Sequence, residues 1–324
     1  MQAKTISIIG LGRLGASVGL ALKQAAVPAQ IVGHDKDNKA GQKAKELGAV
    51  DSLKWNLAEA VAVADILIVA VPPSQLLDTL NVVGGHVQEH AVILDTLPLK
   101  GPGLQWARQN LRRGHYVGAS PVLAADSLTD SREGLAAAHA RLFQQSVICL
   151  MPSPAAEPKA VETAVNLGAA LGAQPFFIDP VEYDALVEGV ETLPGLMAAA
   201  LFQAVTRSVG WRDVLRFAGA PFALMTLPLR DGADLGHLAL QDRQATTRWL
   251  DALLEELQAL RRLVAAGDGD LLRATVEELS LEREKWLRDR ARNEWNEADR
   301  QEVEVPGFAA QLFGFRPRNK VGGK

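Results

Sequence analysis

The fold of this chain is decided by a stretch near its start, TISIIGLGRLGASVGLAL, which covers residues 5–22. It opens with a short apolar run typical of a buried strand and ends in an apolar stretch with helical spacing. Between them, Gly10, Gly12 and Gly15 have GxGxxG spacing. Such glycines allow a tight turn, the approach of a pyrophosphate to the backbone, and close packing of the helix on the strand. This order predicts a dinucleotide site with the phosphates bound at a helix N-terminus.

A carboxylate at the end of the second predicted strand indicates which dinucleotide binds. The strand over residues 30–35 ends in Asp35, twenty residues past Gly15. A carboxylate there accepts hydrogen bonds from a ribose diol and repels a 2′-phosphate, so NAD is favoured over NADP. The alternative is a glycine-rich turn and an ordinary surface aspartate. The residues expected to contact the cofactor are Gly10, Leu11, Gly12, Arg13, Leu14, Gly15, Asp35, Val71 and Pro72.

The pattern of strands and helices divides the chain near residue 180. Up to there, short apolar strands alternate with helices, which predicts a doubly wound, mostly parallel α/β sheet of the Rossmann type over residues 1–179. The same pattern predicts a helix over 132–143 and a loop over 119–130. Beyond Pro180 the spacing is helical, with long helices expected over 181–209, 233–265 and 270–300, the first interrupted at 193–195.

The second half is therefore predicted to be an all-α dimerisation and substrate domain, residues 180–324, with a short C-terminal tail. Helices this long are expected to pack against a second copy of the chain, and the alternative is one compact helical domain.

Composition excludes several other classes of protein. The net charge of −4 argues against a nucleic-acid partner. Cys149 is the only cysteine, which fits a reducing cytoplasm. We expect no metal site, because no pair of histidines has ligand spacing, and no membrane span, because no apolar run approaches about 20 residues.

Further segments resemble one enzyme family. They include ADILIVAVPP at 64–73, Asp95 and Lys100 after the fourth strand, and WRDVLRFA at 211–218. Together with the glycine loop, they make residues 4–265 similar to the prephenate and arogenate dehydrogenases of tyrosine biosynthesis. The resemblance implies a Rossmann domain joined to a helical dimerisation domain, with a small-molecule substrate in the cleft between them. It also implies NAD-dependent oxidation of a ring hydroxyl with loss of the ring carboxylate as carbon dioxide.

The resemblance also suggests substrate residues. Arg216 occupies the position of the family's carboxylate-binding arginine, and the alternative is an ordinary arginine on a helix surface. The family's histidine-bearing segments appear here as Ser120-Pro121-Val122, Tyr183-Asp184 and Glu191-Thr192-Leu193-Pro194-Gly195. The chain therefore reads as a divergent member without the usual catalytic histidines.

Other side chains are candidates to replace those histidines. Ser120 can hydrogen-bond a substrate hydroxyl, although it is a poor base. Asp184, Glu188 and Glu191 have i, i+4, i+7 spacing, which places them on one helical face, and a buried carboxylate there could act as the base. The alternative is a solvated acidic face. Tyr183 donates a hydrogen bond or packs. An acidic cleft would favour an amine-bearing or neutral substrate. The predicted site residues are Ser120, Glu188, Glu191 and Thr192 for catalysis, with Arg216 and Ser120 for substrate.

Three functions remain open at this point. The first is a cytoplasmic dehydrogenase of the prephenate or arogenate type. The second is an oxidoreductase on the same scaffold with another small-molecule substrate. The third is a catalytically silent NAD-binding protein. Turnover of prephenate or arogenate separates the first from the others.

Overall fold

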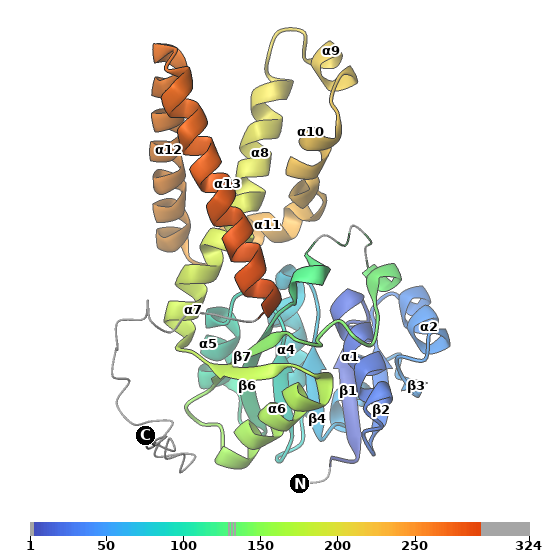
Figure 1. Ribbon diagram of the computed structural model, residues 1–324. Helices are drawn as coiled ribbons and strands as arrows, with labels where there is room; N and C mark the ends of the chain where they lie inside the picture. The colour runs from blue at the N-terminus through green and yellow to red at the C-terminus, as the bar shows by residue number, and fades with distance from the viewer. Residues whose placement is uncertain (1–2, 129, 131, 133, 293–324) are drawn as a thin grey trace, which may run out of the picture.

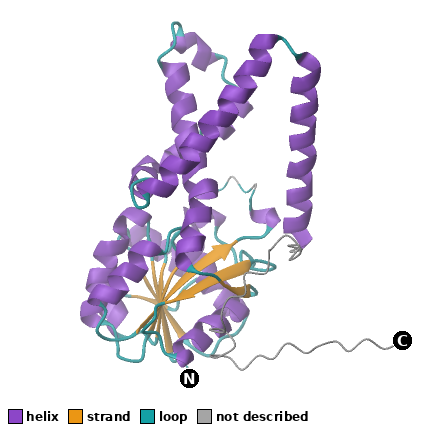
Figure 2. Cartoon of the chain, turned by 90° about the vertical axis from the view of Figure 1, so that its left-hand side faces the viewer, coloured by secondary structure: helices purple, strands orange, loops and turns teal. Residues whose placement is uncertain are grey.

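The fold is built on one twisted sheet from which a set of long helices projects (Figures 1 and 2). The computed structural model describes residues 3–128, 130, 132 and 134–292. The strand order is β3-β2-β1-β4-β5-β6-β7-β8. The strands are β1 Thr5–Ile9, β2 Gln30–His34, β3 Ser52–Leu53, β4 Ile66–Val69, β5 Val92–Asp95, β6 His115–Val122, β7 Val147–Pro152 and β8 Gln174–Phe177.

The pairing of the strands confirms the predicted Rossmann-type sheet. β1 to β6 pair in parallel, and β7 runs antiparallel to β6 with β8 parallel to β7. β1 lies between β2 and β4, so the chain turns from one side of the sheet to the other at this point. Ligands of such sheets bind at the carboxyl ends of the strands beside this reversal.

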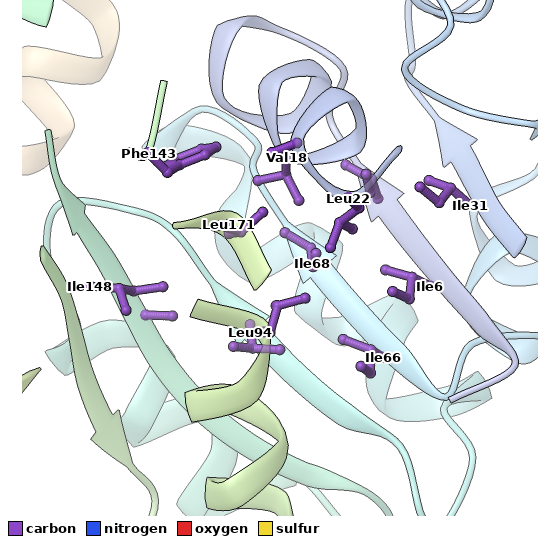
Figure 3. Packing of buried hydrophobic residues seen from close by; sticks show 14 of the residues in the cluster. Ile6, Val18, Leu22, Ile31, Ile66, Ile68, Leu94, Phe143, Ile148 and Leu171 are labelled. Atoms are coloured by element: carbon purple, nitrogen blue, oxygen red, sulfur yellow. The ribbon is translucent and has the colours of Figure 1, made fainter. Parts of the chain in front are cut away.

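Both faces of the sheet are buried, which explains the continuous apolar runs of its strands. In β4, Ile66 and Ile68 point to one face while Leu67 and Val69 point to the other. Figure 3 shows the first face, where Val18 and other side chains pack on the strands. Burying each large aliphatic side chain contributes about 1.5–3 kcal/mol.

The helices divide between these faces. α1 (Arg13–Gln24), α2 (Asn38–Glu46) and α6 (Pro158–Leu171) supply side chains to the first face. The second face is covered by α3 (Leu57–Ala62), α4 (Leu76–His86) and α5 (Gly101–Asn110).

Two local predictions within the sheet half were wrong. The helix expected over 132–143 is one short 3-10 turn, Gly134–Ala137, because tertiary contacts such as the His139 N–H to the Ser17 hydroxyl (3.0 Å) hold this segment over α1. The loop expected over 119–130 begins later, because β6 continues to Val122. Its antiparallel partner β7 pairs Ser120 with Cys149, so Ser120 lies on a strand.

The second half contains only helices among the described residues. They are α7 Pro180–Val187, a π-helical turn η4 Glu188–Thr192, α8 Leu193–Thr206, α9 Trp211–Arg216, α10 Ala220–Met225, α11 Gly232–Leu238, α12 Arg243–Ala266 and α13 Gly269–Arg292. Short 3-10 turns occur in both halves: η1 Pro73–Gln75 and η2 Ala125–Ser127 in the sheet half, and η5 Leu227–Asp231 in the helical half.

The helix limits differ from the prediction in two ways. The interruption expected at 193–195 does not occur, because Pro194 lies in the first turn of α8, where a missing N–H is tolerated. The helix expected over 233–265 is divided between α11 and α12. Residues 293–300 of the last predicted helix, and the C-terminal tail, lie outside the described residues.

The segment from α7 to α8 is the described part of the chain that bears on the prediction about membranes. Pro180–Thr206 is 27 residues long with a mean hydropathy of 1.4 over its most apolar window, enough to span a bilayer by length and composition alone. Only 22% of that window is buried within one chain. A single helix of this kind also occurs in proteins that span no membrane, so the absence of a membrane span stays a prediction.

Candidate active site

The loop between β1 and α1 has the shape that a dinucleotide requires. Gly10 has a φ of +90°, which glycine adopts without strain. A Cβ on Gly15 would overlap the carbonyl oxygen of Gly10, so only glycine lets α1 begin this close to the strand. A Cβ on Gly12 would meet nothing within 4 Å. The backbone at Gly12 is thus exposed to open space, where a pyrophosphate fits.

The carboxylate of Asp35 links the glycine loop to the end of β2. Its Oδ2 accepts from the Leu11 N–H at 2.8 Å, and its Oδ1 accepts from the Asp37 N–H at 2.8 Å. An ionised carboxylate has about four acceptor positions, so about two remain for a ribose diol. No side chain caps the start of α1, which leaves its first N–H groups for phosphate.

The other predicted cofactor residues gather at the same edge of the sheet. Val71 and Pro72 follow β4, and the neighbouring Ala70 carbonyl abuts Gly10. Arg13 is committed elsewhere: its Nη2 donates to the Ser127 carbonyl at 3.3 Å and lies 3.7 Å from Asp130 Oδ2. Arg13 therefore ties the segment after η2 to the start of α1.

The turn after β5 is held by a buried ion pair. Lys100 and Asp95 are both fully buried, and Lys100 Nζ lies 3.1 Å from Asp95 Oδ2 and donates to the Asp95 carbonyl at 2.9 Å. Asp95 also accepts from the Tyr116 hydroxyl (2.6 Å) and from the Leu97 N–H (2.7 Å). Burial lowers the pKa of Lys100, and the Asp95 carboxylate opposes that shift. Because every charge is paired, the turn is rigid.

Ser120 is attached to this turn. It is buried, and its Oγ donates to the Leu97 carbonyl at 2.7 Å. Since its one donor is used, Ser120 has only acceptor lone pairs left, and these are shared between the neighbouring Tyr183 hydroxyl and any bound group.

Tyr183 lies beside Ser120, a neighbour that the sequence did not reveal. Tyr183 of α7 packs on Cys149 and Met151, and Cys149 is the residue opposite Ser120 in the β6–β7 pair. Burial raises the pKa of Tyr183, and the Ser120 hydroxyl lowers it in part. Tyr183 is therefore a neutral hydrogen-bonding group.

The three predicted carboxylates do not share one environment. Asp184 accepts from the Lys100 and Gly101 N–H groups at 2.8 and 2.6 Å, which caps α5 from the helical half. Glu188 is buried against α12, where the Thr246 hydroxyl donates to its Oε2 at 3.3 Å. Glu191 is exposed. The π-helical turn breaks the i, i+4, i+7 face that the sequence predicted, and such turns often mark functional sites.

Two polar atoms in this turn have no partner among the described residues. They are Glu188 Oε1 and Thr192 Oγ1, both buried. Burial raises the pKa of Glu188. The Thr192 hydroxyl, which lies near the carboxyl group without a well-formed hydrogen bond, and the Thr246 hydroxyl lower it in part. The Glu191 residue is exposed overall, but the protein packed around its carboxyl group raises the pKa of that group, and the charge of Arg290 lowers it in part.

The sequence predicted a substrate role for one arginine and did not single out another. Arg216, on α9 at the far end of the helices, has a side chain 74% exposed and lies 3.6 Å from Asp213 (Figure 1). The structure does not bring it to Ser120 within one chain. Arg290 of α13 instead donates to the Leu123 carbonyl directly after β6. Nothing in its charged helical stretch distinguished it from neighbouring arginines.

The two halves also meet over the ends of β4 and β5. Asp234 of α11 accepts from the Ser74 N–H at 3.0 Å. Beside it lies an apolar hollow lined by Leu76, Leu97 and Leu99 from the sheet half and by His237 and Leu238 from α11.

These features define a class of protein, a dinucleotide-binding oxidoreductase scaffold with a helical second half. Comparison with known proteins shows which family the chain is similar to. Residues 18–176 match the family model described as prephenate dehydrogenase, nucleotide-binding domain. A prephenate dehydrogenase of Bacillus subtilis (strain 168) is 26% identical over 272 residues, covering 83% of this chain and 72% of the relative. Residues 18–176 thus match the nucleotide-binding domain of the prephenate dehydrogenase family, and the chain is similar to a member of that family over most of its length.

Two solved structures share the fold. Prephenate dehydrogenase from A. aeolicus, in complex with hydroxyphenyl propionate and NAD+, is 19% identical with a TM-score of 0.76, covering 88% of this chain and 99% of the other. Synechocystis arogenate dehydrogenase is 21% identical with a TM-score of 0.66, covering 87% and 99%. The similarity therefore extends into the helical half.

Proposed function

We propose that this protein is an NAD-dependent dehydrogenase that oxidatively decarboxylates prephenate or arogenate. The observation that carries the proposal is the placement of the glycine loop, Asp35 and Ser120 along one carboxyl edge of the sheet in a chain similar to this family. The cofactor and the reacting ring then lie on the same side of the molecule.

The residues present fit NAD. The open space over Gly12 suits the pyrophosphate, and the free acceptor positions of Asp35 suit the adenosine ribose. A 2′-phosphate would lie against the Asp35 charge, which disfavours NADP. When bound, NAD would supply the hydride acceptor for the ring carbon that bears the hydroxyl.

Ser120 and Glu191 have the substrate roles in this proposal. Ser120 accepts a hydrogen bond from the substrate hydroxyl, because its own proton is held by Leu97. Glu191 is the accessible carboxylate of the π-helical turn, and its raised pKa brings its basicity closer to that of a hydroxyl-deprotonating base. Tyr183 positions the side of the substrate ring that lies near Ser120.

Glu188 and Thr192 support this turn from inside the helical half. Their unpartnered oxygens form a polar site that an ordered water or a substrate group can complete. Removing either oxygen is expected to disturb the placement of Glu191.

The helical half supports a homodimer in which Arg216 contributes from a second copy. Large apolar side chains are exposed along these helices, among them Val190 (69%), Phe217 (81%) and Leu224 (66%). A second copy covers such a surface better than water does. We also propose a cytoplasmic location and a division of the chain after Asp179.

Turnover decides between this function and its alternatives. The purified protein is mixed with NAD and either prephenate or arogenate, and the absorbance of reduced nicotinamide is followed. Product formation with either substrate supports the proposal. If NAD binds without turnover and members of a panel of hydroxy acids perturb the bound cofactor, another small-molecule substrate is favoured. If NAD binds and no member of the panel perturbs it, a catalytically silent protein is favoured.

A further inference from the structure

A cation of the last helix contacts the backbone directly after β6, the strand that carries Ser120. Arg290 lies near the end of α13, and its Nε and Nη2 donate to the Leu123 carbonyl at 3.2 and 2.7 Å. Leu123 directly follows β6 and is three residues beyond Ser120. This double contact fixes the guanidinium at the carboxyl end of β6, where the proposed substrate hydroxyl binds.

Most of the donors of Arg290 remain available. A guanidinium has five N–H groups, and the Leu123 carbonyl takes two of them. None of the described residues accepts from the other three. The side chain is half-buried, and its planar guanidinium with these free donors suits an anion with planar geometry.

The nearest opposite charge leaves room beside the guanidinium. Glu191 and Arg290 influence each other electrostatically, yet the described ion pairs within 4.0 Å do not include them. Since the two charges influence each other but form no ion pair, a bound molecule can interact with both of them. An anionic group of that molecule would bind at Arg290, and a proton donor would bind at Glu191.

We propose that Arg290 is a further substrate-binding residue, whose free guanidinium N–H groups bind a carboxylate of the substrate beside Ser120. This inference rests on the proposed function, since the substrates named there carry carboxylates. It gives each chain its own carboxylate anchor, whereas Arg216 lies at the far end of the helices. The anchor places the substrate hydroxyl between Ser120 and Glu191.

Binding of a product-like phenol tests the anchor without catalysis. Calorimetry measures the binding of 3-(4-hydroxyphenyl)propionate and of its neutral amide to the NAD-saturated protein. Arg290→Gln keeps a donor for the Leu123 carbonyl but removes the charge. We expect it to weaken carboxylate binding by about ten- to a hundred-fold and to leave amide binding unchanged. The affinity of Arg290→Lys for the carboxylate should lie between those of the wild type and Arg290→Gln.

Arg288→Ala is the matched control. Arg288 lies on the same helix, is exposed, and pairs with Glu284 at 3.7 Å. Its removal should not change carboxylate binding. A wild-type protein that binds the amide as tightly as the carboxylate would overturn the anchor. So would an Arg290→Gln variant that keeps the wild-type preference, or an equal loss in Arg288→Ala.

Kinetics separates the anchor from the proposed reaction. If prephenate or arogenate is turned over, Arg290→Gln should raise KM more than it lowers kcat. The acid limb of the pH–rate profile of Arg290→Gln should also move to higher pH, because Glu191 loses the cation that lowers the pKa of its carboxyl group. If neither is turned over but carboxylate binding still depends on Arg290, the reaction is wrong and the anchor stands. A merely structural Arg290 would change the melting temperature without changing the carboxylate preference.

Discussion

The contact between Asp184 and the start of α5 is the sharpest test of how the two halves are joined. Asp184 comes from the helical half, and it accepts from the Lys100 and Gly101 N–H groups at 2.8 and 2.6 Å. Asp184→Ala removes both acceptors and leaves two half-buried N–H groups to be satisfied by water.

The expected cost follows from these contacts. Loss of a capping side chain costs about 0.5–2 kcal/mol, and hydrogen bonds to a charged group are worth about 1.5–3 kcal/mol each. Burial raises the pKa of Asp184, which shows that placing the carboxylate there offsets part of this gain. We therefore expect a loss of about 2 kcal/mol in unfolding free energy, or a melting temperature lower by about 4 °C.

The assay is hydrogen exchange at the two amides, combined with urea unfolding. A loss of about 2 kcal/mol should speed exchange at Lys100 and Gly101 by about thirty-fold. Asp179→Ala is the matched control, because Asp179 also accepts from two N–H groups, those of Val181 and Glu182, but on an exposed helix end. It should fray α7 without changing exchange in α5. Wild-type exchange at both α5 amides in Asp184→Ala would refute the reasoning.

Three further variants test other parts of the fold and site. Asp35→Ala should weaken NAD binding by about ten-fold or more in a fluorescence titration, because the ribose loses a charged acceptor; unchanged affinity would remove Asp35 from the ribose site. Gly15→Ala should abolish NAD binding and lower the melting temperature, since its Cβ overlaps the Gly10 carbonyl, and a variant that melts and binds like the wild type would contradict the close packing of α1. The hydrogen-bonded Lys23 ammonium lowers the pKa of Asp51 in the folded protein. The contribution of the Asp51 carboxylate to stability is therefore present above its unfolded pKa of about 4 and is lost as the pH falls through its folded pKa. Asp51→Asn should therefore destabilise the protein at pH 7 but have little effect at pH 2–3, and a constant difference in unfolding free energy across this range would rule out the linkage.

Local physics made the sheet half predictable from sequence. The strands are short apolar runs buried on both faces, and the glycines that the dinucleotide loop requires leave few alternatives. The segment over 132–143 could not be predicted in this way. Its helical composition is overridden by contacts with Ser17 and the face of α1, which depend on residues over a hundred positions away.

The helical half shows the limit of periodicity. An i, i+4, i+7 pattern assumes a regular α-helix, and it placed Asp184, Glu188 and Glu191 on one face. The π-helical turn over 188–192 rotates Glu188 into α12 and leaves Glu191 accessible. A single irregular turn therefore gives three similar side chains three different roles, as a cap, a buried acid and an exposed acid.

Distance along the chain is what concealed Arg290. A motif search weighs residues near one another or near a known pattern, and Arg290 lies 170 residues after Ser120 in a stretch with several exposed arginines. Only the return of α13 to the end of β6 distinguishes it.

The same contacts connect the two halves of the chain mechanically. Asp184, Asp234 and Arg290 each bind backbone groups of the sheet half, at the start of α5, at η1 and after β6. A shift of the helices would therefore move the Lys100 turn, the hollow beside Leu97 and the Arg290 guanidinium together, so the placement of substrate groups depends on how the halves are joined.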